Sequence, residues 1–314
     1  YTRAVVSALE ATGYYRFDRV VASAAEAESL IAAGTVAFVV TIPSDLARRI
    51  DRGDRPRILI EADATDPSAS SGAISALGTV VRRALTREQG IGDVAAEETA
   101  SRLDVVVHRR YNPEGVSQYN IVPGLLGVIL QMTMVMMTSI ALTREIERGT
   151  MENLLAMPSS PFEIMLGKVL PGLAVGAVQT VVVLAAARLL FDIPFAGDPL
   201  TLVGAILVFV LALVLLGYLI STMARTQMQA LQLTFFFFLP SIMLSGFMFP
   251  FRGMPEWAQW IGEFFPLTHF LRVVRAVMLK GAGFPDIAAE LSVLALFVIA
   301  YGALALVRFR STLD

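Results

Sequence analysis

A short charged segment, Arg144-Glu145-Ile146-Glu147-Arg148-Gly149-Thr150-Met151-Glu152-Asn153-Leu154-Leu155, separates two long apolar stretches of the chain. Its guanidinium and carboxylate groups could bind a groove of complementary charge on another protein. Gly149 could end one helix, and Thr150 could cap a second helix that carries Glu152 in its first turn. The segment is therefore a candidate contact for a partner that pushes on this chain. The alternative is an ordinary interfacial loop whose charges pair with one another.

Residues that could catalyse a reaction or bind a metal ion are few. His108 and His269 are the only histidines, they are far apart in the sequence, and cysteine is absent. The phosphate-binding loop Gly-x-x-x-x-Gly-Lys-Ser/Thr is also absent, because Gly167-Lys168 lacks both the first glycine and the hydroxyl residue. We therefore expect no catalytic residue, no metal site and no cofactor bound by this chain.

The composition separates a polar N-terminal third from an apolar remainder. In the whole chain 55% of residues are hydrophobic and 17% are charged, whereas about a quarter are charged in a soluble domain. Residues 1–117 hold 14 arginines and 16 acidic residues, and the longer part, residues 118–314, holds 11 basic and 11 acidic residues. The net charge of −2 gives no basic footprint for nucleic acid.

The polar part, residues 1–117, predicts a small α/β domain. Apolar runs alternate with helical patterns, which is typical of βαβ-like crossovers. We expect strands at Tyr15–Val21, Val36–Ile42, Arg57–Ala62 and Leu103–His108, and helices at Ala24–Ala32, Asp45–Asp51 and Ser68–Glu88.

The remainder, residues 118–314, predicts an α-helical transmembrane bundle. Each span should match the ~20 residues that cross the hydrocarbon core. We expect spans at about residues 121–142, 166–191, 199–223, 227–251 and 287–307, a charged connection at 143–161 and further helices at 254–280. Three charged residues lie near span ends, where long side chains can reach the interface: Lys168, Arg188 and Glu290.

Basic residues orient this bundle through the positive-inside rule. Three connections that alternate correctly carry Arg144, Arg148, Arg225, Arg308 and Arg310, so these ends are expected in the cytoplasm. Four basic residues disagree, because this topology places them outside: Arg252, Arg272, Arg275 and Lys280. Residues 1–117 would also lie outside, which needs a further transmembrane helix before Tyr1 and six spans in all.

Several motifs resemble the ABC-2 type permeases, which are membrane subunits of ATP-binding-cassette exporters. The run Glu147-Arg148-Gly149-Thr150-x-Glu152-x-Leu154, followed by Pro158, is similar to the cytoplasmic coupling segment of that family. Shorter matches follow in the family's order: Tyr111-Asn112-Pro113-Glu114, Val122-Pro123-Gly124, and Pro255-x-Trp257 before Pro266-Leu267-Thr268. Residues 39–53 look like the large external domain of the drug-export branch.

The resemblance implies one helix, an external domain and then five helices, in a homodimer or beside a sister permease. It also implies two cytoplasmic ABC ATPase subunits, which would bind ATP and Mg²⁺. The residues that it implies for ATPase coupling are Arg144, Glu145, Glu147, Arg148, Gly149, Thr150, Glu152, Leu155 and Pro158.

Two further groups of residues are candidates by the same resemblance. The helices that would form the substrate path or dimer interface contain Gln131, Met134, Phe235, Phe238, Pro240 and Met243. Pro240 is expected to kink or break its helix, and the alternative for this group is plain helix packing. External gate helices would contain Trp257, Trp260, Pro266 and His269, and the alternative is a simple interfacial anchor.

Together these observations predict the permease of an ATP-driven exporter in a bacterial inner membrane. Its substrate would be hydrophobic or amphipathic, drug-like or lipid-like, and its partners would include membrane lipids and a periplasmic adaptor protein. One alternative is a mechanotransmitter, which relays ATPase motion to the external domain without passing substrate. The other is a membrane sensor whose external domain binds a ligand.

Overall fold

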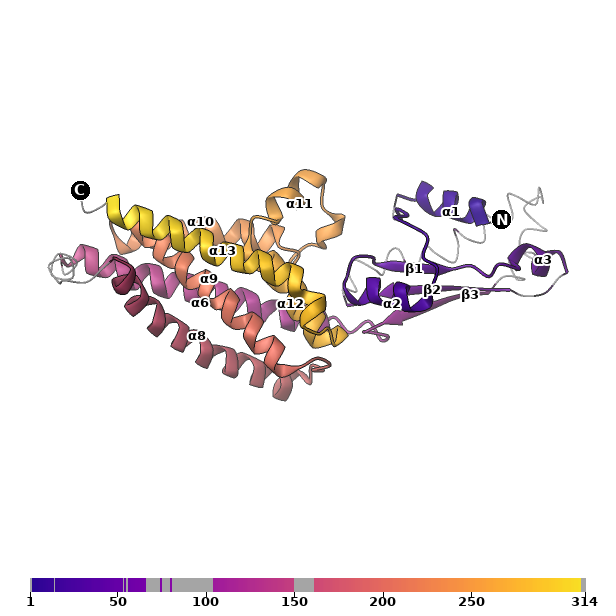
Figure 1. The fold of residues 1–314 in the computed structure, drawn as a ribbon, viewed down its shortest axis with the longest axis horizontal. Coiled ribbons are helices and arrows are strands. Elements are labelled where there is room, and N and C mark those ends of the chain that lie inside the picture. Colours follow the sequence, from indigo (N-terminus) through magenta and orange to yellow (C-terminus); the bar gives the residue numbers. More distant parts are fainter. Residues whose placement is uncertain are drawn as a thin grey trace. The chain divides into compact units, whose positions relative to one another are not determined.

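The structure consists of two compact units, Tyr1–Ser117 and Gln118–Asp314 (Figure 1). It is a computed structural model that describes residues 2–13, 15–52, 54, 56–65, 74, 80, 104–149 and 161–311. Each unit has a hydrophobic core of its own, so each is described by itself.

The N-terminal unit contains a three-stranded sheet and short helices. Its strands are β1 (Phe38–Thr41), β2 (Arg57–Asp63) and β3 (Asp104–Arg110), in the order β1-β2-β3. β1 is antiparallel to β2, with Val40 opposite Ile60, and β2 is parallel to β3. The described helices are α1 (Thr2–Ala11), α2 (Ala24–Ala32) and α3 (Leu46–Asp51). The mixed α/β class predicted for this region is confirmed.

The middle strand supplies the core of this unit. Ile58 and Ile60 are fully buried, and their neighbours along β2 are more exposed, as the two-residue period of a strand requires. Val5 and Leu9 of α1 belong to the same cluster. Helix α1 was not among the sequence expectations, and its two buried residues lie one helical turn apart.

One predicted strand, Tyr15–Val21, is wrong, because those residues form neither helix nor strand. Tyr15 is buried with its ring edge-on to Phe38, at 5.2 Å between centroids, but residues 16–20 are exposed. A single anchoring aromatic therefore holds this segment without a hydrogen-bonded ladder. The predicted helix Ser68–Glu88 lies outside the described residues except at positions 74 and 80.

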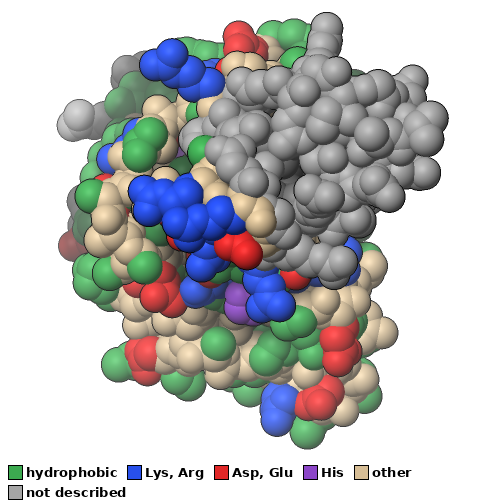
Figure 2. Space-filling model, turned by 90° about the vertical axis from the view of Figure 1, so that its right-hand side faces the viewer, with side chains coloured by type: hydrophobic (Ala, Val, Ile, Leu, Met, Phe, Trp, Pro, Cys, Tyr) green, Lys and Arg blue, Asp and Glu red, His purple; other side chains and the backbone are tan. Residues whose placement is uncertain are grey.

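Charges of both signs are mixed on the N-terminal unit. Arg110 forms ion pairs with Glu28 and Glu61, and Arg57 pairs with Asp104. Hydrogen bonds to the two glutamates raise the pKa of Arg110. On the face drawn in Figure 2, basic side chains likewise gather next to acidic ones. Arg57 and Arg110 are thus matched locally by carboxylates.

The second unit is a helical bundle that agrees with the predicted membrane class. Five helices of the described residues are long and apolar enough to cross a membrane. They are α6 (Gln118–Glu147), α8 (Pro161–Phe191), α9 (Pro199–Met223), α10 (Gln227–Leu244) and α13 (Phe284–Ser311). Pro161 and Pro199 are the first residues of α8 and α9. At this position the missing N–H of proline loses no hydrogen bond within the helix.

Helix α9 lies at the centre of the bundle and packs against α6, α8, α12 and α13. Small residues allow the close approach of its neighbours. A Cβ added at Gly217 of α9 would lie 2.9 Å from the carbonyl oxygen of Val135 on α6, and one added at Gly176 of α8 would lie 2.4 Å from Val210 Cγ1. The α6–α9 and α8–α9 contacts therefore depend on glycine.

Helix α10 is shorter than predicted, because it ends at Leu244 and not near residue 251. Gly246 follows with φ of +84°, a left-handed conformation that favours glycine, and Phe251–Gly253 forms a 3-10 turn. Pro240 was expected to kink or break this helix, and the helix continues through it without a break. Ser241 is buried directly after the proline and donates a hydrogen bond to Gln131 of α6.

Two shorter helices, α11 (Glu256–Gly262) and α12 (Pro266–Lys280), complete the bundle. Together with the loop between α8 and α9 they lie at one end of this unit. The last turn of α6, the turn between α9 and α10 and the end of α13 lie at the opposite end (Figure 1). α12 packs against α6, α9 and α13 and buries most of its residues.

Candidate functional site

The predicted coupling residues begin in the last turn of α6. The helix ends at Glu147, and Gly149 adopts φ of +69°, so this glycine ends the helix as expected. Arg144, Glu147 and Arg148 are exposed, and Glu145 is half-buried. Four further candidates lie outside the described residues: Thr150, Glu152, Leu155 and Pro158.

Two carboxylates of this turn connect α6 to neighbouring helices. Glu145 forms an ion pair with Lys168 in the second turn of α8. Glu147 accepts a hydrogen bond of 2.7 Å from the backbone N–H of Gln227 and one of 2.5 Å from its side-chain amide. Gln227 is the first residue of α10. The last turn of α6 is thus bonded to the second turn of α8 and to the first turn of α10, whereas Arg144 and the adjacent Arg148 are exposed.

Polar side chains also connect α6 and α10 farther along the two helices. Ser241 donates a 3.2 Å hydrogen bond to Gln131 Oε1, and the hydroxyls of Ser139 and Thr234 are 3.2 Å apart. Gln131 is 1% exposed, and its Nε2 has no hydrogen-bond partner among the described residues. Hydrogen bonds of this kind hold helices together where the surroundings are apolar.

The candidate path residues divide between the core and the surface. Gln131 and Met134 are each 1% exposed, and Met134 packs beside Gly176 of α8, so both lie inside the bundle. Phe235 and Met243 are exposed on α10 at 41% and 48%. The structure therefore does not bring all the candidates to one surface, although Phe235 and Phe238 make an edge-to-face contact at 6.5 Å.

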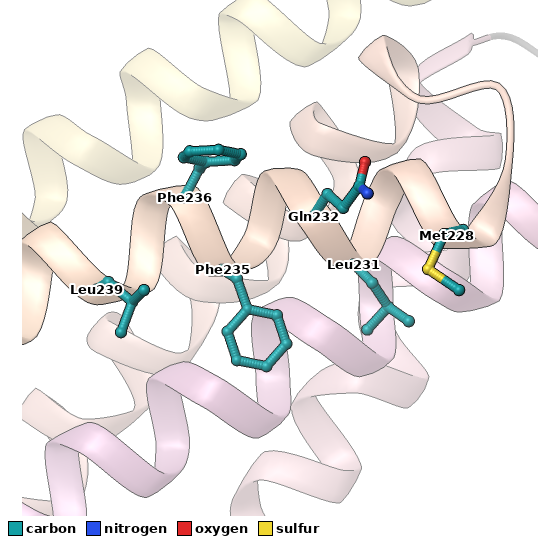
Figure 3. Close-up of a pocket in the computed structure, with 6 residues that line it drawn as sticks. All are labelled: Met228, Leu231, Gln232, Phe235, Phe236 and Leu239. Carbon is teal, nitrogen blue, oxygen red and sulfur yellow. The ribbon is translucent and has the colours of Figure 1, made fainter.

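An apolar groove of about 310 Å³ runs along the outward face of α10 (Figure 3). Its lining consists of Met228, Leu231, Gln232, Phe235, Phe236 and Leu239. The opposite face of the helix, with Ala230, Thr234 and Ser241, is buried. Flexible thioether and aromatic side chains of this kind suit varied apolar ligands or an apolar partner. Apart from Phe235, the sequence analysis did not single out these residues.

A network of charged side chains lies at the α11–α12 end of the bundle. Arg272 of α12 donates to both Glu263 oxygens, at 2.5 and 3.1 Å, and to Glu290 of α13 at 3.2 Å. His269 Nδ1 lies 2.6 Å from the Glu290 carboxylate. The guanidinium of Arg272 also lies 4.7 Å from the ring centre of Phe251. The network joins the segment after α11 to α12 and α13.

The four candidate gate residues differ in exposure. Trp257 and Trp260 of α11 are 65% and 74% exposed, as expected for an aromatic surface. Pro266 and His269 lie in the first turn of α12 and are buried, and the gate role of all four residues stays a prediction. α12 packs against α6, α9 and α13, which buries these two residues. Sequence analysis missed Glu263 and Arg272, although Glu290, the one charge within its predicted span, was a signal.

Comparison with known proteins decides the family. Residues 1–307 match the family described as ABC-2 family transporter protein. The chain belongs to this family.

Its relatives include transport permeases of bacteria. The permease is 30% identical over 305 residues to the inner membrane transport permease YhhJ of Escherichia coli K12, covering 93% of this chain and 77% of the relative. It is 29% identical over 273 residues to the probable multidrug ABC transporter permease YbhR of the same strain, covering 87% and 73%. With the linearmycin resistance permease protein LnrN of Bacillus subtilis 168 it shares 24% over 281 residues, covering 83% and 72%.

Membership of the family fixes the coarse function. The chain is a multi-pass membrane protein and the permease subunit of an ABC transporter. Permeases of this family have no catalytic activity of their own, and ABC ATPase subunits are their partners. The family suggested by the sequence motifs and the predicted membrane class are therefore confirmed.

Proposed function

We propose that this permease exports a hydrophobic or amphipathic substrate, and that ATPase subunits drive it by pressing on residues 144–158. The single observation that carries the proposal is the last turn of α6. It presents Arg144 and Arg148 outward, whereas Glu145 and Glu147 hold it to α8 and α10. A partner that binds the arginines would therefore move a turn that is bonded to two other helices.

The orientation of the bundle supports a cytoplasmic position for this turn. Arg144, Arg148, Arg225 and Arg308 are exposed at the same end of the unit, as the positive-inside rule favours. At the other end, Arg272 is paired with Glu263 and Glu290. Arg275 donates to the Gly246 carbonyl at 3.2 Å. Two of the four basic residues that disagree with this orientation, Arg272 and Arg275, are thus held by contacts within the bundle.

The substrate class follows from the groove on α10 and from the relatives. The groove lining is apolar except for Gln232, which suits a greasy ligand better than a sugar or an ion. Two relatives are named for multidrug transport and for linearmycin resistance. We propose the same broad class here, in a bacterial inner membrane, with a second copy or a sister permease completing the transporter.

Charge reversal at the coupling turn tests the proposal. Glu147→Lys combined with Arg148→Glu should abolish co-purification of the ATPase and the resistance of expressing cells to a panel of amphipathic toxins. The matched control is Arg188→Glu combined with Asp192→Lys, which reverses an exposed ion pair at the other end of α8. The control should retain both properties. Normal ATPase association and normal resistance in the Glu147/Arg148 variant would refute the proposal.

A further inference from the structure

The ammonium group of Lys168 is an unusual feature inside a membrane-spanning helix. It lies in the second turn of α8, and its side chain is 16% exposed. A charge at this depth is costly, so it needs a partner, and it marks a position with a role beyond packing. The partner is Glu145, whose side chain is 38% exposed on the last turn of α6. A partly buried ion pair contributes little to stability on balance, so stability alone does not account for it.

Gln227 forms a second tie at the same place. Its backbone N–H and side-chain amide both donate to the Glu147 carboxylate. The Thr226 hydroxyl caps the same helix by accepting from the N–H of Gln229. The carboxylate of Glu147 therefore lies against the positive end of the α10 dipole, which favours it. The first residue of α10 is thus hydrogen-bonded to a carboxylate of α6.

The contact at Gln227 is the first of three side-chain hydrogen bonds between α6 and α10, which we call the α6–α10 ladder. Its rungs pair residues 147, 139 and 131 of α6 with residues 227, 234 and 241 of α10. Steps of seven residues are close to two helical turns, so the three residues of α10 lie on one face of that helix. Steps of eight residues turn the contact by about 80° around α6 each time, so the contact moves around α6 along its length. A polar contact therefore recurs at two-turn intervals along the shared length of the two helices.

We propose that Lys168 and Gln227 are positioning residues for ATP-driven transport. Lys168 holds the coupling turn through Glu145, and Gln227 holds it through Glu147. A displacement of that turn then moves α6, α8 and α10 together, and the ladder carries it along α10 toward the α11–α12 end. The proposal rests on the proposed function, because it needs a motor that moves the coupling turn.

The test measures motion at the far end and needs no knowledge of the substrate. The chain has no cysteine, so Leu200→Cys and Glu256→Cys allow spin labels at two exposed positions of that end. The full-length permease is reconstituted with its ATPase in liposomes, and the distance between the labels is measured with and without ATP and vanadate. We expect Lys168→Met to reduce the population of the nucleotide-dependent distance about fivefold, while ATP hydrolysis continues.

Two further variants separate positioning from folding. Exchange of the charges, Glu145→Lys with Lys168→Glu, restores the pair and should restore the distance change. Arg188→Met removes a charge from the same helix, but its partner Asp192 lies four residues away and both are exposed, so this variant should behave like the wild type. Gln227→Leu should give a smaller loss than Lys168→Met, because the backbone N–H still bonds to Glu147.

The outcomes distinguish the two proposals. If the wild type shows no nucleotide-dependent distance, the proposed function fails. If the wild type responds and Lys168→Met responds equally, or if the exchanged pair is as defective as the single variant, the positioning role is wrong. If Lys168→Met does not fold, Gln227→Leu decides: an unchanged distance distribution overturns the proposal, and a reduced one supports it.

Discussion

The crossing of α6 and α9 at Gly217 gives the most quantitative prediction, which is the effect of Gly217→Ala. The added Cβ would lie 2.8 Å from Thr138 Cβ and 2.9 Å from the carbonyl oxygen of Val135. Carbon atoms in contact normally lie at about 3.5–4.0 Å. Since the Val135 oxygen belongs to the backbone of α6, no side-chain rotation can relieve the overlap, and the two helices must separate.

The size of the effect can be worked out from two terms. Overpacking at a rigid contact costs about 1–3 kcal/mol, and replacing glycine by alanine in a helix returns up to ~1 kcal/mol. Gly217→Ala should therefore lose up to about 2 kcal/mol on balance. Gly204 is the matched control on the same helix, because a Cβ there meets nothing within 4 Å. Gly204→Ala should gain up to ~1 kcal/mol.

Thermal unfolding of the purified permease in detergent measures the difference. The two variants differ by the overpacking cost of about 1–3 kcal/mol. At about 2–4 °C per kcal/mol for a unit of 150–250 residues, the melting temperature of Gly217→Ala should lie roughly 2–12 °C below that of Gly204→Ala. Fluorescence-detected size-exclusion chromatography after heating gives both values. Equal melting temperatures for the two variants would refute the close contact at Gly217.

Two further changes are expected to have defined effects. Arg272→Met removes the cation between Glu263 and Glu290. About a third of the Arg272 side chain is exposed, so the loss of stability should be about 1–2 kcal/mol and smaller than for a fully buried pair. An unchanged melting temperature would contradict this prediction. Asp198 caps α9, and the hydrogen bonds from the Thr201 hydroxyl and N–H hold its pKa below the usual value, so its contribution is present above the unfolded pKa and is lost as pH falls through the folded pKa. Asp198→Asn keeps a capping oxygen without titrating, and its melting temperature should therefore fall less steeply between pH 5 and pH 2 than that of the wild type; parallel curves would contradict the assignment.

Sequence reasoning located the membrane helices well because it depends on length and apolar composition alone. α9 runs from Pro199 to Met223, the residues expected from the sequence. The end of α10 was misplaced because residues 245–251 are apolar, although Gly246 turns the chain out of the helix. The strand expected at Tyr15–Val21 failed for a related reason, since an apolar start does not ensure a partner strand.

The contacts between helices could not be predicted in the same way. Ser241 and Gln131 are 110 residues apart, and their meeting depends on which faces of α6 and α10 pack together. Single apolar helices carry little information on that choice, because lipid and protein are similarly apolar surroundings. The groove on α10 was hidden for the same reason: its lining residues look like any other lipid-facing surface.

Isolated charges in the spans were the signal that the sequence did hold. Lys168 and Glu290 were explained by their nearness to span ends, where side chains can reach the interface. The structure instead pairs Lys168 with Glu145, and it pairs Glu290 with Arg272 and His269. Both residues therefore connect helices, one at each end of the bundle. The proposal that α6, α8 and α10 move together depends on this pairing of Lys168. A lysine that only reached the interface would leave α8 unconnected to the coupling turn, whereas a lysine paired with Glu145 makes α8 move with that turn.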